Sequence, residues 1–202
     1  MKLNHFSRPE TTATRAALEV AAEYLSEALL NHSIRSWYWA VGFAAVEDRT
    51  GFDAELLYVA AILHDVGLAE EFDNHTLSYE HAAGHVARAL TAGAGWETQR
   101  RTRALEVIVR HNWPEVDPLL DVEGHLLEVA TGLDISGARP DVLPMAFQRE
   151  VLQRYPRLGL AAEFGACVTD QASRKPTTAA ARLVAGGLVR KLRENPLERV
   201  AG

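Results

Sequence analysis

The sequence has almost no cysteine and no long hydrophobic run. The single cysteine, Cys167, excludes a disulfide within the chain and fits a reducing compartment. The most apolar stretch, residues 56–63, is too short to cross a bilayer. The N-terminus, MKLNHFSRPE, lacks the apolar run of a signal peptide. We therefore expect a cytoplasmic protein that does not enter a membrane.

An excess of positive charge is also missing. The chain has 21 Lys and Arg against 27 Asp and Glu, which gives a formal net charge of −6. Proteins that bind nucleic acids usually carry a basic surface, so we expect a small-molecule substrate and no nucleic-acid partner. The apolar segment 179–192 either closes the core or contributes to a homo-oligomer, and the sequence leaves both readings open.

No segment alternates apolar and polar residues over the length of a strand. Apolar residues recur three and four apart instead, a period that predicts helices. We expect an all-α fold of about eight or nine helices, with Asp53 as the N-cap of the third helix and a break at residues 31–33 between the first two. The expected helices run through residues 12–29, 37–45, 54–64, 78–90, 97–111, 123–132, 144–154, 160–173 and 178–193.

Two metal-ligating residues end the most apolar of these helices. His64 and Asp65 follow the run Ala61-Ile62-Leu63 directly. A charged aspartate is costly to bury at this place unless a cation compensates it, and a metal ion would also use the neighbouring imidazole. For an isolated His-Asp pair, the alternative is a loop-capping aspartate beside a surface histidine.

Three further residues of the same kinds sit where we expect helices to end. These are His32, His111 and Asp134. In a helical bundle, ends on one side can converge on a single cavity. Imidazole nitrogens and carboxylate oxygens suit Zn²⁺, Fe²⁺ and Mn²⁺, and we expect one divalent ion, with Zn²⁺ first among the three.

The order His32, His64-Asp65, Asp134 resembles the HD superfamily of metal-dependent phosphohydrolases and related enzymes. The segments around these residues are similar to the HD-type cyanamide hydratases, which add water to the nitrile of cyanamide to give urea. The matching segments are NHSIRSWYWA, LLYVAAILHDVGL, SYE, ATGLDISG, RYPRLG and DQASRKP.

This resemblance implies a site and a domain. It assigns metal ligation to His32, His64, Asp65 and Asp134, with Asp65 counted among the catalytic residues. Glu80 and His111 would then either support the metal ligands from behind or handle protons; here Tyr79 stands where the family's motif has phenylalanine. We expect one HD-type helical bundle over residues 1–202, with its core at about 25–140 and the C-terminal helices 141–202 packed on it.

Two residues near His32 are candidate substrate contacts. Arg35 would either orient a polar or anionic substrate or pair with an acidic neighbour. Trp37 belongs either to the pocket wall or to the core.

The other histidines are weaker candidates. His81 and His85 are four apart and share a helix face, so a second metal there is an alternative to two surface histidines. The remaining three, His5, His75 and His125, are expected to be exposed.

The expected function is metal-dependent hydration of a small nitrile-type substrate. Phosphate-ester hydrolysis is the main alternative and predicts several Lys or Arg side chains around the metal, whereas the sequence places only Arg35 close to a ligand. A ligand-binding module without turnover is a second alternative, and the complete set of ligands argues against it.

Overall fold

The computed structural model describes residues 1–200, and all regular structure in that range is helical, without a strand. The all-α prediction is confirmed, but eight or nine helices is too low a number. The α-helices are α1 (Thr12–Tyr24), α2 (Glu27–Val46), α3 (Ala54–Leu63), α4 (Tyr79–Gly93), α5 (Thr98–Arg110), α6 (Val122–Thr131), α7 (Met145–Arg154), α8 (Leu160–Arg174), α9 (Ala179–Ala185), α10 (Leu188–Arg193) and α11 (Leu197–Val200). Short turns of other helix types are η1 (Leu3–His5), η2 (Val66–Leu68) and η3 (Gly132–Ser136).

Side-chain caps explain where several of these helices begin. Thr11 and Thr14 form a reciprocal capping box at α1, and the Asp53 side chain accepts a hydrogen bond from the backbone N–H of Leu56 at α3. Asp121 does the same at α6 with Gly124. The predicted cap at Asp53 is therefore confirmed.

The break between the first two helices lies earlier than expected. Ser26 caps α2 by accepting from the backbone N–H of Leu29, and α2 then runs without interruption through residues 31–33. Asn31, a weak helix former, lies inside this helix, and its side chain donates to the carbonyl of Pro156. His32 consequently lies within a helix and not at its end.

The segment 178–193 forms two helices where one was expected. The glycine pair 186–187 separates α9 from α10, and Gly187 adopts a φ of +79°. Side chains rarely adopt this left-handed conformation, so a glycine here ends the first helix and redirects the second.

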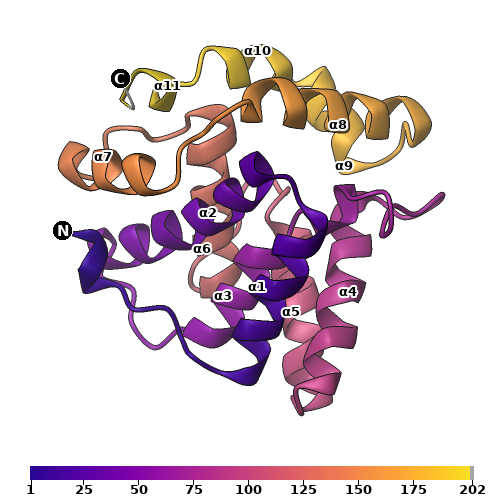
Figure 1. The fold of residues 1–202 in the computed structure, drawn as a ribbon, viewed down its shortest axis with the longest axis horizontal. Helices are drawn as coiled ribbons and strands as arrows, with labels where there is room; N and C mark the ends of the chain where they lie inside the picture. The colour runs from indigo at the N-terminus through magenta and orange to yellow at the C-terminus, as the bar shows by residue number, and fades with distance from the viewer. Residues whose placement is uncertain (201–202) are drawn as a thin grey trace.

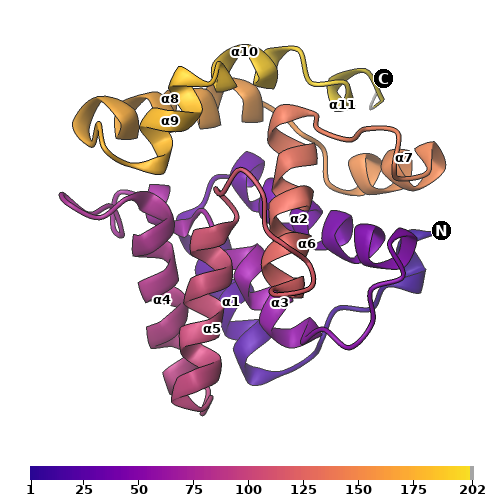
Figure 2. The ribbon, with the colours of Figure 1, turned by 180° about the vertical axis from the view of Figure 1, so that it is seen from behind.

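The helices form two parts (Figure 1). Helices α1 to α6 make a bundle, and α7 to α11, here called the C-terminal layer, lie across one end of it. Figure 2 shows the same layer from behind, with α4 and α5 side by side in the bundle. The apolar helix α3 packs against α1, α2 and α5 in the middle of the bundle, and its residues 56–63 are at most 2% exposed.

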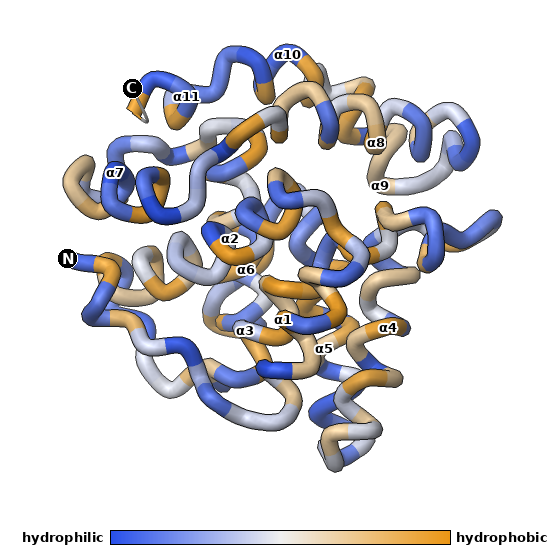
Figure 3. The backbone as a smooth tube through the Cα atoms, viewed as in Figure 1, coloured by the Kyte–Doolittle hydropathy of each residue, from blue (hydrophilic) through white to orange (hydrophobic). Residues whose placement is uncertain are grey.

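The hydropathy of the chain follows this arrangement. Figure 3 shows apolar segments gathered along α1 and α3 inside the bundle, with hydrophilic ones along α10 and α11. Within residues 1–200, no helix is both long and apolar enough to cross a membrane.

Candidate metal centre

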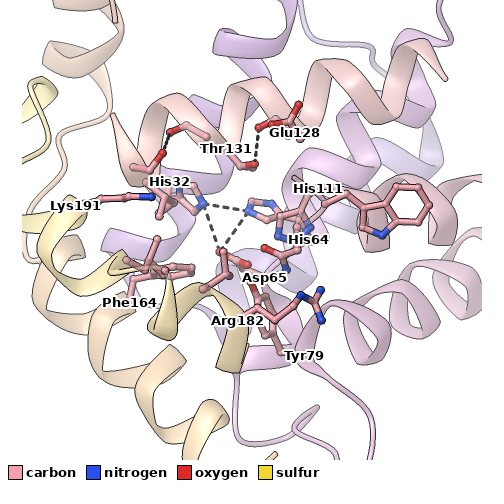
Figure 4. A pocket seen from close by; sticks show the side chains of 18 residues that line it. His32, His64, Asp65, Tyr79, His111, Glu128, Thr131, Phe164, Arg182 and Lys191 are labelled. Carbon is pink, nitrogen blue, oxygen red and sulfur yellow. Dashed lines mark hydrogen bonds and ion pairs between the residues drawn. The ribbon is translucent and has the colours of Figure 1, made fainter. Parts of the chain in front are cut away.

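Three of the predicted ligands meet at one point between α2 and α3. His32 comes from the second turn of α2, His64 ends α3, and Asp65 follows it directly. The two Nε2 atoms are 3.0 Å apart, and Asp65 Oδ2 lies 3.4 Å from Nε2 of His32 and 3.3 Å from that of His64 (Figure 4). Around a tetrahedral ion with bonds of about 2.0–2.2 Å, ligand atoms are separated by roughly 3.3 Å. The spacing therefore fits a shared metal ion.

Hydrogen bonds on the far side of each imidazole fix its orientation. His64 Nδ1 lies 2.8 Å from the carbonyl oxygen of Ala61, which can only accept, so Nδ1 carries the proton. His32 Nδ1 donates in the same way to Asp134 Oδ2 at 2.7 Å. Both Nε2 lone pairs therefore face each other and the Asp65 carboxylate, an arrangement that needs a cation between them.

Asp65 provides the test of whether a metal fits. Both of its carboxylate oxygens are buried and have no hydrogen-bond partner in the described residues. Burial alone would raise the pKa of Asp65, and only positive charge beside it, on His64 and His32 or on a cation between them, lowers that pKa below its usual range. An ionised carboxylate in this position is strongly unfavourable without compensation, so the residues present fit a divalent cation.

The structure does not bring Asp134 into this cluster. Its turn, η3, places the carboxylate behind His32, where Oδ1 accepts from Arg35 Nε and Trp39 Nε1 at 2.9 and 2.7 Å. Oδ2 accepts from His32 and from Arg35 Nη2, both at 2.7 Å. Burial would raise the pKa of Asp134, but the Arg35 guanidinium holds it well below its usual range. In this geometry Asp134 lies behind His32, bonded to its Nδ1, outside the group formed by His32, His64 and Asp65.

Neither of the predicted substrate contacts, Arg35 and Trp37, lines the cavity that opens beside the cluster. Arg35 is fully buried and donates to Asp134 and to the carbonyls of Tyr155 and Pro156. Of its two proposed roles, the structure shows pairing with an acid. Trp37 is 2% exposed and packs edge-on against Tyr58, so it belongs to the core.

The two predicted proton-handling residues lie in different places. The ring of His111 is 4.8 Å from that of His64, and its Nδ1 donates to the carbonyl of Ile108, which leaves Nε2 as an acceptor. Burial, with the neighbouring His64, lowers the pKa of His111 to about 3. Glu80 is buried in the first turn of α4, where it accepts from Ser78, and it lines a neighbouring pocket that does not contain the cluster.

A cavity of about 230 Å³ opens beside the cluster. The bundle and the C-terminal layer both form its wall, so residues far apart in sequence face one another across it (Figure 4). From the bundle come His32, His64, Asp65, Tyr79, His111 and Glu128. The C-terminal layer contributes Phe164, Arg182, Leu183, Leu188 and Lys191.

Three charged residues of this cavity were missed by the sequence analysis. Glu128 shares a face of α6 with Thr131 three residues later, a spacing that could have indicated it. Burial raises the pKa of Glu128 to about 7. Arg182 lies on α9 and Lys191 on α10, and no motif in the sequence marks either residue.

The remaining histidines form no second cluster. His81 and His85 are exposed on α4, and in residues 1–200 the only group of metal-ligating side chains is His32, His64 and Asp65. His5 and His75 are exposed as expected. The expectation for His125 is wrong: it is 9% exposed and bonds to Glu47 and to the Val116 carbonyl, because α6 packs it against α2.

Comparison with known proteins shows the family of this chain. Residues 29–136 match the model of the HD domain, and the chain belongs to that family. Its fold and relatives define it as a metal-dependent hydratase or hydrolase. Two curated relatives are the cyanamide hydratases DDI2 and DDI3 of Saccharomyces cerevisiae. Each is 30% identical over 173 residues, which cover 83% of this chain and 76% of the relative.

Proposed function

We propose that this protein hydrates a small nitrile-type substrate, converting cyanamide to urea or an analogous nitrile to its amide. The observation that carries the proposal is the buried, unpartnered Asp65 carboxylate facing two imidazole lone pairs. The cavity of about 230 Å³ beside it suits a small molecule. Two relatives named as cyanamide hydratases support the choice of substrate.

His32, His64 and Asp65 would hold one divalent metal and leave a coordination position open. Zn²⁺ is the first candidate, and Fe²⁺ and Mn²⁺ are the alternatives for nitrogen and oxygen ligands. Such an ion activates water at neutral pH and polarises the group under attack. Asp134, backed by Arg35 and Trp39, keeps Nε2 of His32 turned toward His64 and Asp65, where the ion would bind.

Two residues of the cavity wall suit different parts of hydration: one can orient the water, and the other can exchange protons. Water oxygen bonds to the nitrile carbon, the water loses a proton, and the nitrile nitrogen gains one. His111 lines the cavity with Nε2 unprotonated and can accept a hydrogen bond that orients the water, but with a pKa of about 3 it is too weak a base to keep the proton. Glu128 has a carboxyl pKa of about 7 and can donate one to the nitrogen.

Phosphate-ester hydrolysis is the second candidate, and one observation favours it. Arg182 and Lys191 line the cavity, which supplies two of the cations that this reaction calls for. A module that binds a ligand without turnover remains the third reading, and the same assay tests it.

The experiment is to purify the protein, load it with Zn²⁺, Fe²⁺ or Mn²⁺, and measure urea formed from cyanamide beside phosphate released from nucleotides and phosphodiesters. We expect urea from the wild type and none from His64→Ala. Phosphate release without urea would replace the hydratase by the phosphohydrolase. Metal binding with neither product from these substrates would contradict the proposed reaction and favour the binding module.

A further inference from the structure

The outer wall of the metal cavity carries two cations from the C-terminal layer. Arg182 lies on α9 and Lys191 on α10, and both are exposed side chains that line the cavity (Figure 4). Within residues 1–200, neither of them forms an ion pair or a side-chain hydrogen bond. They therefore present charge to whatever enters. We call this pair the cationic rim.

Cations elsewhere around the site are neutralised. Behind the cluster, Arg35 and Arg157 pair with Asp134. Where the C-terminal layer meets the bundle, Lys175 pairs with Asp73 at 2.7 Å. The two cations of the rim differ from Arg35, Arg157 and Lys175, because no carboxylate within residues 1–200 pairs with them.

The charge balance of the cavity also favours an anion. A divalent ion held by two neutral imidazoles and one carboxylate leaves a net positive charge. Glu128 is the opposing carboxyl in the wall, and burial raises its pKa to about 7, which reduces its negative charge at neutral pH. Local potential in such a cleft can oppose the formal net charge of −6 and attract an anionic ligand.

We propose that the cationic rim binds an anionic group of the substrate, a carboxylate or a phosphate, next to the group that reacts at the metal. The proposal rests on the proposed function for the reacting group and adds a substrate class to it. A neutral molecule such as cyanamide would then fit the metal site without using the rim.

The test compares two nitriles of nearly equal size, cyanoacetate and its uncharged analogue cyanoacetamide. The measured quantity is kcat/KM for cyanoacetate divided by kcat/KM for cyanoacetamide. It is measured in the metal-loaded wild type, in Arg182→Gln/Lys191→Gln, and in Arg193→Gln. Arg193 is an exposed arginine on α10 outside this cavity and serves as the control. We expect the double variant to lower the ratio about tenfold, the size of a lost charge-assisted contact, and the control to keep it.

Equal ratios in the double variant and the control would overturn the proposal. If neither nitrile reacts, calorimetric titration of the same three metal-loaded proteins with cyanoacetate and with inorganic phosphate tests the rim alone, while the cyanamide assay separately tests the hydratase proposal. Weaker binding of these anions by the double variant supports the proposed role of the rim. Tighter binding of phosphate than of cyanoacetate then identifies phosphate as the anionic group that the rim prefers. Unchanged binding in the double variant overturns that role.

Discussion

His32 and His64 reach the metal centre through Nε2 because an acceptor on the other side of each ring holds the proton on Nδ1. For His64 the acceptor is a backbone carbonyl, which no substitution removes. For His32 it is the carboxylate of Asp134, and this side chain can be changed. The orientation of one ligand is therefore open to a direct test.

Asp134→Asn should weaken metal binding without abolishing it. The amide can still accept from His32, but it loses the charge that pairs with Arg35, and changes of this kind cost about 10–100-fold in metal affinity. Competition with a chelator measures the affinity, and circular dichroism checks the fold. One equivalent bound at saturating metal, with reduced affinity, supports an orienting role. Failure to bind metal at any concentration would instead make Asp134 a direct ligand, as the sequence predicts.

Glu128→Gln should change how stability depends on pH. Burial raises the pKa of Glu128 from 4.5 to about 7, so the unfolded chain ionises first and the folded state loses stability as pH rises through this window. The groups acting on this carboxyl are His125, Arg139, Glu115 and Glu47. Urea unfolding at pH 4 to 8 should show the variant gaining stability relative to wild type with rising pH. A constant difference, like that expected for the exposed control Glu19→Gln, would contradict it.

At the scale of elements, much of the fold follows from local signals. The apolar period and the cap at Asp53 predict α3, and the His-Asp pair after it predicts the centre of the site. The course of α2 through Asn31 could not be predicted, because the helix is buried by tertiary packing and Asn31 finds its hydrogen-bond partner at Pro156, 125 residues away. The position of Asp134 depends likewise on donors from α2, and the π-helical turn that carries it leaves no pattern in the sequence.

The turn after Asp65 depends on a close approach between backbones. A Cβ on Gly67 would lie 2.1 Å from the carbonyl oxygen of Tyr79 and 3.0 Å from the N of Ala83, both backbone atoms of α4. Gly67→Ala should therefore push η2 away from α4 and lower the free energy of unfolding by about 3 kcal/mol or more.

Gly93→Ala provides the matched control for this substitution. Its Cβ would meet nothing within 4 Å, and alanine favours a helix over glycine, so the variant should be as stable as wild type or more so. Thermal and urea unfolding measure both proteins. Equal stability of Gly67→Ala and wild type would contradict the close approach of η2 and α4.

At the scale of the whole molecule, the cavity exists because the C-terminal layer lies across the bundle. Lys175, at the end of α8, helps to join the two: it is 4% exposed and donates to Asp73 at 2.7 Å and to the Leu77 carbonyl at 2.9 Å. The sequence alone offered no role for this lysine. Its partners lie about a hundred residues earlier in the chain, so the role appears only in the folded molecule.

Lys175→Met should lower the free energy of unfolding by about 1–3 kcal/mol, because it removes the hydrogen bonds of a buried ammonium to Asp73 and to the Leu77 carbonyl. Arg174→Met is the neighbouring control; its exposed pair with Asp73 should contribute less than about 1 kcal/mol. Burial alone would raise the pKa of Asp73, but Gln171, Lys175 and Arg174 lower it from 3.8 to about 2. The ionised Asp73 therefore contributes to the free energy of unfolding fully above pH 3.8, and this contribution is lost as the pH falls through 2. A larger cost for Arg174→Met than for Lys175→Met would contradict the assignment.

The central claim is that His32, His64 and Asp65 hold one divalent metal ion. The most direct test is the metal content, by mass spectrometry, of purified and metal-supplemented wild type, Asp65→Asn and the exposed control His81→Ala. We predict about one equivalent in the wild type and in the control, and loss of the bound metal in Asp65→Asn with the helical fold retained. A wild type that binds no metal, or an Asp65→Asn protein that keeps it with unchanged affinity, would contradict the account.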